Sequence, residues 1–266
     1  MTGFRYCFGP VGSWRLGASL GIDPVSQPGK VCTFDCVYCQ LGTRPAQAPC
    51  RASYVRPEDL GAELARIKAP ADYLTFSGGC EPTMASNLTE LRIKCGRHRP
   101  EKTAIITNAS LIYSEKVREE LAAFDFVIAK LDAPDNSLFK AINRPGPGVS
   151  FEEIVKGLVL FSKGRRGRLA IQSMFIAPNQ AAARSLAALY AEIAPDEVQL
   201  NTPLRPCGVK PLSKEELAPV RGGIAAELER LGAGRIKITD VYSQSAPDVV
   251  PVSAPDTLRR RGKSGG

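Results

Sequence analysis

The sequence predicts an α/β protein in which one domain is built on a parallel β-sheet. Short apolar runs alternate with amphipathic stretches about six times along the chain. The length of 266 residues, 44% of them hydrophobic, is enough for one large core. Regular strand–helix alternation places the helices outside a parallel sheet, which is either doubly wound or a barrel, complete or incomplete.

The predicted strands are short apolar runs bounded by polar or turn residues. They cover residues 19–23, 74–79, 103–108, 126–133, 169–176 and 198–203, with 235–242 as a candidate for a last strand. Because parallel sheets carry their chemistry at the carboxyl ends of the strands, the residues that follow these runs are the candidates for a site.

The predicted helices lie between the strands. A helix that starts at Pro57 places Leu60, Leu64 and Ile67 on one face. An apolar stripe over residues 186–193 predicts another helix. Two further helices begin with capping boxes, Ser150 with Glu153 and Ser213 with Glu216.

The folded domain is expected to cover residues 1–242. Residues 243–266 are rich in Ser, Pro, Gly and Arg, and are predicted to form a disordered basic tail. This tail supplies four cationic side chains to a net charge of +8. The remaining excess of positive charge permits RNA or another anionic partner without requiring one.

The cysteine content favours a metal or catalytic role. No apolar run approaches the roughly 18 residues that span a membrane, and no secretory signal is visible, so we expect a cytoplasmic protein without a membrane partner. The cytoplasm keeps thiols reduced, so the eight cysteines of the chain are not expected to form disulfides. A close cysteine cluster is better explained by a metal.

Three cysteines, Cys32, Cys36 and Cys39, follow the first predicted strand within KVCTFDCVYCQLG, with the spacing C-x3-C-x2-C. A structural zinc site takes four protein ligands, so the fourth would have to be His98 or a distant cysteine. An iron–sulfur cubane held by three thiolates instead leaves one iron open, as a catalytic metal centre requires.

This motif, with the aromatic Tyr38 just before its last cysteine, resembles the signature of the radical S-adenosylmethionine (radical SAM) superfamily. The resemblance implies a partial, six-stranded, TIM-barrel-like (β/α) fold. It also implies a [4Fe–4S] cluster on the three cysteines and S-adenosylmethionine as cosubstrate. An electron donor such as flavodoxin or ferredoxin would drive reductive cleavage to a 5′-deoxyadenosyl radical, which abstracts hydrogen from an unidentified second substrate.

The segment FSGGCEPT is similar to the Gly-Gly-Glu motif of the same family. That similarity implies that Gly78, Gly79 and Glu81 hold the ammonium group of S-adenosylmethionine, because glycine lets backbone approach a ligand and a carboxylate pairs with a cation. Cys80 stands where relatives usually carry glycine. A Gly–Pro turn with a solvated Glu81 is the alternative.

Polar residues at the later strand ends extend this predicted site. Asn108 matches a Thr-Asn-Gly-like position that contacts adenosine, with Ala109 replacing the glycine, although a helix N-cap is an alternative. Ser173 matches a position that contacts the ribose in relatives. Lys130 and Asp132 share a face, as a charged pair over the site or as a structural ion pair. The buried amides Gln172, Gln199 and Asn201 either bind a ligand or bond each other.

Two further segments, KLDAP and INRP, resemble the wybutosine-synthesis branch, whose members act on a tRNA guanine. Other segments are closer to a bacterial and archaeal group of Fe–S oxidoreductases related to these 4-demethylwyosine synthase-like enzymes. The tRNA enzymes carry extra upstream cysteines for a second cluster, whereas only Cys7 precedes the motif here, so no second cluster is expected.

Three alternatives to a radical enzyme on an unidentified substrate stay open. They are a tRNA-modifying wybutosine-type enzyme, a glycyl-radical activating enzyme, and a zinc-stabilised binding protein without enzymatic activity.

Overall fold

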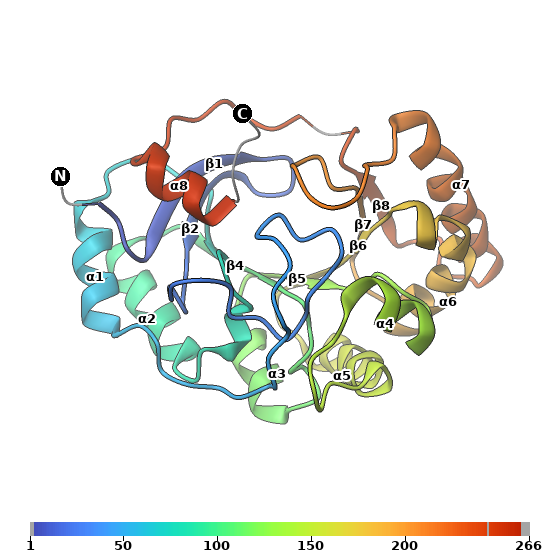
Figure 1. Ribbon diagram of the computed structural model, residues 1–266, viewed down its shortest axis with the longest axis horizontal. Helices are drawn as coiled ribbons and strands as arrows, with labels where there is room; N and C mark the ends of the chain where they lie inside the picture. Colours follow the sequence, from blue (N-terminus) through green and yellow to red (C-terminus); the bar gives the residue numbers. More distant parts are fainter. Residues whose placement is uncertain (1–2, 244, 262–266) are drawn as a thin grey trace.

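The computed structural model describes residues 3–243 and 245–261, which form an eight-stranded sheet with the strands in chain order (Figure 1). β1 (Cys7–Ser13) and β2 (Gly17–Ile22) form an antiparallel hairpin. All later neighbours are parallel. These parallel strands are β3 (Tyr73–Phe76), β4 (Lys102–Thr107), β5 (Phe126–Lys130), β6 (Arg168–Met174), β7 (Glu197–Asn201) and β8 (Lys237–Asp240).

The helices lie mainly on the outer side of the curved sheet (Figure 1). Ser150 accepts a hydrogen bond from the Glu153 N–H, and Ser213 with Glu216 forms the complete capping box that the sequence predicts. The helices are α1 (Pro57–Arg66), α2 (Leu88–His98), α3 (Glu115–Ala122), α4 (Asn136–Asn143), α5 (Phe151–Gly164), α6 (Ala183–Ile193), α7 (Lys214–Arg230) and α8 (Ala254–Arg261), with 3-10 turns at η1 (Pro82–Met84) and η2 (Ala177–Ala182).

The sheet is a partial barrel, because β1 and β8 are its two edges among the described residues. This confirms the predicted fold class, and every predicted strand is present. The strand count exceeds the predicted six, because 235–242 contributes β8 and because β1 was not predicted. The sequence CFGPVGS reads poorly as a strand, since Pro10 cannot donate to a ladder and is tolerated mainly at an edge, where β1 lies.

Alternate side chains of the parallel strands face opposite layers. The outward residues, such as Ile105, Val127 and Ile171, belong to the large core shared with the helices. The inward residues at the amino ends of the strands, among them Ala104, Phe126, Ile128 and Ala170, form a separate small apolar cluster. This cluster fills the interior of the barrel near the amino ends of the strands, so a site has room only near their carboxyl ends.

The C-terminal segment differs from the predicted disordered tail. Ala254–Arg261 form α8, which lies beside β1 (Figure 1). The Gly9 N–H donates to Thr257 Oγ1 at 3.0 Å, and the Val252 N–H donates to the Gly9 carbonyl at 2.6 Å. Order arises here because the segment covers an edge strand, which local composition does not reveal. Residues 244 and 262–266 of the predicted tail lie outside the described residues.

Within 3–243 and 245–261, no helix combines the length and apolar character needed to cross a membrane.

Candidate functional site

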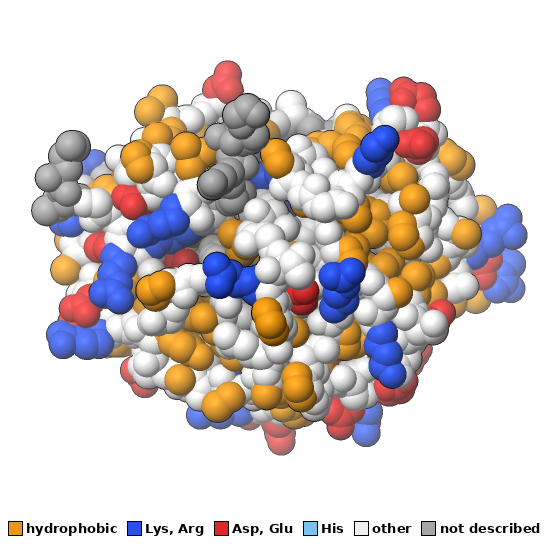
Figure 2. Space-filling model, viewed as in Figure 1, with side chains coloured by type: hydrophobic (Ala, Val, Ile, Leu, Met, Phe, Trp, Pro, Cys, Tyr) orange, Lys and Arg blue, Asp and Glu red, His pale blue; other side chains and the backbone are white. Residues whose placement is uncertain are grey.

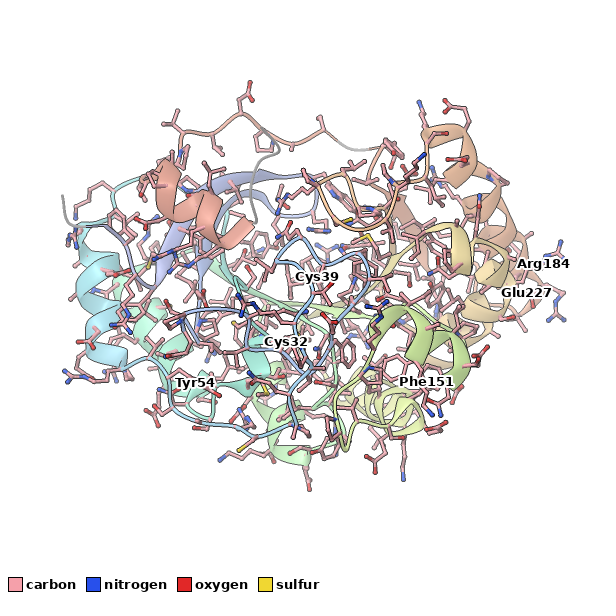
Figure 3. All side chains as sticks on the ribbon, viewed as in Figure 1. Cys32, Cys39, Tyr54, Phe151, Arg184 and Glu227 are labelled. Atoms are coloured by element: carbon pink, nitrogen blue, oxygen red, sulfur yellow. The ribbon has the colours of Figure 1, made fainter. Side chains whose placement is uncertain are left out.

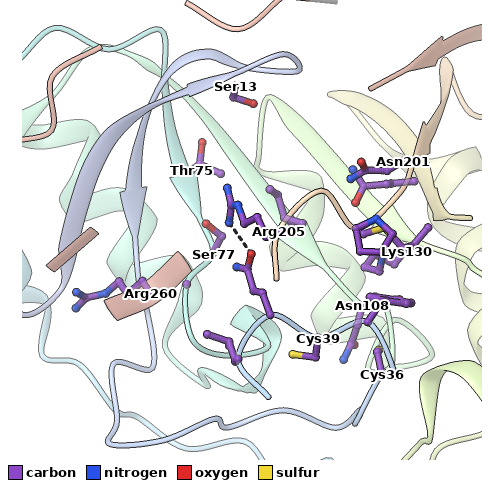
Figure 4. A pocket seen from close by; sticks show the side chains of 18 of the residues that line it. Ser13, Cys36, Cys39, Thr75, Ser77, Asn108, Lys130, Asn201, Arg205 and Arg260 are labelled. Carbon is purple, nitrogen blue, oxygen red and sulfur yellow. Dashed lines mark hydrogen bonds between the residues drawn. The ribbon is translucent and has the colours of Figure 1, made fainter. Parts of the chain in front are cut away.

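A cavity of about 560 Å³ opens at the carboxyl ends of the parallel strands (Figure 4). Residues at or just after the ends of β3 to β7 line it, as do all three cysteines of the C-x3-C-x2-C motif. Figure 3 shows Cys32 and Cys39 near the centre of the molecule, in the loop that follows β2. The lining includes Tyr38, Gly78, Glu81, Asn108, Lys130, Gln172, Met174 and Asn201.

The end of α4 and the residues just after it hold the cysteine loop. The N–H groups of Val37 and Asp35 donate to the carbonyls of Ile142 and Asn143 at 2.9 and 3.1 Å. The Gly146 N–H donates in return to the Thr33 carbonyl at 2.8 Å. A helix end leaves carbonyls without intrahelical partners, so the loop and α4 satisfy each other's backbone.

Two of the three sulfur atoms accept N–H hydrogen bonds. Cys32 Sγ accepts from the Phe34 N–H at 3.4 Å and from Asn108 Nδ2 at 3.5 Å. Cys36 Sγ accepts from Asn143 Nδ2 at 3.5 Å. Burial raises the pKa of the Cys32 thiol to about 12 and that of the Cys36 thiol to about 11. Both thiols are therefore protonated at neutral pH until a metal displaces the proton.

Lys30 places a buried cation beside the same loop. Its Nζ lies 3.2 Å from Asp35 Oδ1. Burial by itself would lower the pKa of Lys30, but Cys39, Cys32 and Asp35 together raise it overall. A fixed positive charge therefore stands next to two of the three candidate thiolates.

The donor set fits a thiolate-held iron–sulfur group, since three thiols face one cavity and two accept N–H bonds of the kind that tune such groups. His98, the single histidine of the chain, ends α2 and is not among the lining residues. In the described part of the chain, no three or more His, Cys, Asp or Glu side chains are arranged to hold a single metal ion.

Glu81 is buried, and its carboxylate joins two strand-end loops. Oε1 accepts from the Thr83 N–H at 3.0 Å, from Thr83 Oγ1 at 2.7 Å and from Thr107 Oγ1 at 2.6 Å. Oε2 accepts from the Asn108 N–H at 2.7 Å. Burial raises the pKa of Glu81, and these hydrogen bonds oppose the rise. The sequence alternative of a solvated Glu81 is therefore wrong.

The glycines before Glu81 play different parts. Gly78 lines the cavity and has φ +137°, and a Cβ there would lie 2.7 Å from the Asp23 carboxylate, so only glycine fits. Gly79 is not among the lining residues, and nothing lies within 4 Å of an added Cβ. Cys80 lines the cavity and does not belong to the described residues with positive φ. The extra side chain at Cys80 is therefore compatible with the loop.

Asn108 contributes three interactions to the site besides its N–H bond to Glu81. Its Nδ2 donates to Cys32 and, at 2.9 Å, to Thr33 Oγ1, and its Oδ1 accepts from the Ser110 N–H at 2.9 Å. It does not cap a helix, since α3 begins seven residues later at Glu115. Ala109 has φ 62°, so the chain adopts a left-handed conformation where the resemblance expects glycine.

The expectation for Ser173 requires a correction. Ser173 is fully buried, and its Oγ bonds the Leu131 carbonyl and Tyr190 Oη of α6, the latter at 2.6 Å. It shares the outward face of β6 with Ile171, because side chains alternate along a strand. Gln172 and Met174 face the cavity in its place. Gln172 Nε2 donates to Gln199 Oε1 at 3.4 Å, so of the two predicted alternatives these two amides bond each other.

Tyr38 lies in the cysteine loop and belongs to a buried polar cluster with Asp132, Asn143 and Lys130. Its hydroxyl donates to Asp132 Oδ2 and accepts from Asn143 Nδ2 at 3.1 Å. Lys130 Nζ lies 3.4 Å from Asp132 Oδ1 and 4.9 Å from the centre of the Tyr38 ring. The predicted charged pair at the end of β5 is therefore present, with Lys130 in the cavity wall.

Roles for Lys30, Asn143, Gln40 and Arg205 were not predicted from the sequence. Arg205 Nη1 donates to Gln40 Oε1 at 2.6 Å, which links the loop after β7 to the cysteine loop (Figure 4). For Asn143 the sequence gave a signal only through the resemblance of the INRP segment, which assigned no role to a single side chain. Figure 2 shows several Lys and Arg side chains around the middle of this face.

Comparisons with known proteins place these features in a family. The family model described as the radical SAM superfamily matches residues 26–175. A UPF0026 protein of Synechocystis sp. is 40% identical over 217 residues, covering 80% of each chain. A UPF0026 protein of Methanocaldococcus jannaschii is 34% identical over 239 residues, covering 87% of this chain and 74% of that one.

Solved structures share the fold. Streptococcus suis SuiB bound to S-adenosylmethionine superposes with a TM-score of 0.63 at 18% identity, over 85% of this chain. The match spans 50% of the SuiB chain, so this protein corresponds to about half of SuiB. TYW1 with a lysine–pyruvate adduct bound gives a TM-score of 0.59 at 18% identity, covering 78% of this chain and 73% of that chain. At these identities the likeness concerns the fold alone.

Proposed function

Because the chain belongs to the radical SAM superfamily and is an enzyme of that class, we propose that Cys32, Cys36 and Cys39 hold a [4Fe–4S] cluster for reductive cleavage of S-adenosylmethionine. The observation that carries this proposal is that the three cysteines line one cavity together with Gly78, Glu81 and Asn108. When bound, the cluster supplies one electron and an open iron position to the cosubstrate.

The protein's own residues prepare the sulfur atoms. Asn108, Asn143 and the Phe34 N–H donate to Cys32 and Cys36, and Lys30 adds a positive charge beside them. Such donors withdraw negative charge from sulfur and stabilise a reduced cluster. In this proposal an external flavodoxin or ferredoxin delivers the electron.

The residues around Glu81 receive the methionyl end of S-adenosylmethionine in this proposal. Gly78 presents backbone to the cavity, and Glu81 keeps the loops of Gly78 and Asn108 at a fixed separation. Oε1 accepts three of the four bonds to Glu81, so Oε2 is the oxygen we assign to the ammonium group. Tyr38 and Asn108 border the adenosine side.

A reaction on RNA is the second candidate, favoured by the charge of the cavity wall. Five cationic side chains line the cavity in the described residues, together with the carboxylate of Glu81. These cations are Arg15, Lys30, Lys130, Arg205 and Arg260. Three of the five are paired with carboxylates outside the lining, Lys30 with Asp35, Lys130 with Asp132 and Arg260 with Asp23. A polyanionic substrate suits such a wall, and its binding would weaken steeply with salt.

The proposal is tested by anaerobic reconstitution with iron and sulfide. We expect absorbance typical of an iron–sulfur cluster, and 5′-deoxyadenosine on addition of dithionite and S-adenosylmethionine. No 5′-deoxyadenosine from protein that carries its full iron content would contradict the proposal. Stoichiometric zinc without iron would establish the zinc-stabilised alternative, and a stable radical on a co-purifying protein partner would identify a glycyl-radical activating enzyme.

A further inference from the structure

Arg260 of α8 forms a buried ion pair with Asp23, 237 residues away in the sequence. Arg260 Nε lies 3.2 Å from Asp23 Oδ2, and both residues are 4% exposed. The guanidinium also donates to the Arg5 carbonyl and, at 3.3 Å, to Ser26 Oγ. A buried carboxylate needs a cation or several donors, and α8 supplies the cation.

Asp23, which Arg260 holds in place, also contacts the loop before Glu81. Its Oδ2 accepts from the Gly79 N–H at 3.4 Å, and its Oδ1 accepts from Cys80 Sγ at 3.3 Å. The carboxylate also lies against Gly78, where an added Cβ would come within 2.7 Å of it. One side chain therefore contacts three consecutive residues of the loop.

The position of α8 is determined by contacts with the N-terminal segment as well. The Phe4 N–H donates to Asp256 Oδ2 at 2.8 Å, and the Gly9 N–H donates to Thr257 Oγ1 at 3.0 Å. Thr257 is buried, and Arg260 itself reaches the cavity wall (Figure 4). The helix thus delivers one buried cation to a defined place beside the cavity.

We propose that α8 is part of the cosubstrate site and that Arg260 is a positioning residue, which fixes Asp23 and, through it, the backbone of Gly78 and Gly79. This inference rests on the proposed function, because the proposed function assigns the Gly78 backbone to the methionyl end of S-adenosylmethionine. Without the guanidinium, the buried Asp23 carboxylate loses its cation and keeps the N–H groups of Val25, Ser26 and Gly79 as donors, so the contact that fixes Oδ2 beside Gly78 and Gly79 is lost.

The test compares Arg260→Ala with Arg259→Ala, a matched control on the same helix, since the Arg259 side chain is 60% exposed. Anaerobically reconstituted full-length protein is titrated with S-adenosylmethionine by equilibrium dialysis. Iron content and the thermal unfolding midpoint are measured on the same samples. We expect Arg260→Ala to weaken binding about tenfold or more at unchanged iron content, and Arg259→Ala to stay within about twofold of the wild type.

Two conservative variants keep the test decisive if Arg260→Ala does not fold. Arg260→Lys retains the charge but not the fork of donors, so its affinity should lie between those of the wild type and Arg260→Ala. Asp23→Asn retains shape and should weaken binding as much as Arg260→Ala. In both variants, adding S-adenosylmethionine should change the electron paramagnetic resonance spectrum of the reduced cluster less than it does in the wild type.

Affinities of Arg260→Lys and Asp23→Asn within twofold of the wild type would overturn the inference, as would a loss of affinity that only follows a loss of iron. If the iron-loaded wild type fails to bind S-adenosylmethionine, the proposed function fails, and the inference fails with it. A wild type that binds alongside variants that bind equally well refutes the inference alone.

Discussion

Glu81 Oε2 accepts a hydrogen bond of 2.7 Å from the backbone N–H of Asn108, which joins the loops after β3 and β4. In Glu81→Gln, an amide N–H₂ would face this N–H, or the Thr83 and Thr107 donors if the amide turns. One buried donor then loses its partner, so we expect the free energy of unfolding to fall by about 1–3 kcal/mol.

Urea denaturation of the apo protein measures this change. The control is Glu152→Gln, since this side chain is exposed in the first turn of α5. An unfolding free energy for Glu81→Gln equal to that of the wild type would show that the carboxylate does not join the two loops.

Cys36→Ala should abolish cluster binding, because two thiolates do not hold a cubane. We expect less than about a tenth of the wild-type iron after reconstitution. Cys50→Ala is the matched control: Cys50 is exposed, is not among the lining residues, and its loss should leave iron content unchanged. Near-stoichiometric iron in Cys36→Ala would refute the assigned ligand.

Burial predicts slow alkylation of Cys32 and Cys36 in the apo protein. Their pKa values are raised to about 12 and about 11, so at pH 8 the reactive thiolate is a minor form. As long as the pH is below these values, each unit of increase should raise their iodoacetamide rates about tenfold. Mass spectrometry of peptides gives the rates, with the exposed Cys50 as the fast reference. Equal rates at pH 8 for all three thiols would contradict the buried positions.

Tyr38→Phe removes the hydroxyl that donates to Asp132 and accepts from Asn143. Because one partner is a buried carboxylate, we expect a loss of about 1.5–3 kcal/mol in the free energy of unfolding. Tyr113→Phe serves as the control, since Tyr113 is 42% exposed and its hydroxyl loss should change stability little. Equal unfolding midpoints for the two variants would argue against the buried polar cluster of Tyr38, Asp132 and Asn143.

Ala109→Gly should stabilise the protein by up to about 1 kcal/mol, because Ala109 occupies φ 62°, where glycine avoids the clash of a Cβ. The opposite sign is expected for Ala226→Gly in the exposed middle of α7, at about 0.5–1 kcal/mol. Thermal and urea unfolding of both variants measure the pair. A destabilised Ala109→Gly would mean that this backbone conformation carries no strain.

The sequence alone predicted the strands β2 to β8 in their order, the helices α1, α5, α6 and α7, and the cysteine motif of the site. Hydrophobic periodicity is a local property, so the runs at 103–108 and 126–133 could be identified without knowledge of their neighbours. The spacing of Cys32, Cys36 and Cys39 is local too, and their place after a strand put them at the carboxyl edge of the sheet.

Only the tertiary structure decided which side chains meet. Ser173 turned outward because the register of β6 gives it the same face as Ile171, a consequence of strand alternation that the resemblance did not take into account. Composition predicted disorder for the last residues, whereas Arg260 forms an ion pair with Asp23 near the other end of the chain. Such pairings depend on the relative placement of elements more than 200 residues apart, and no local pattern encodes that placement.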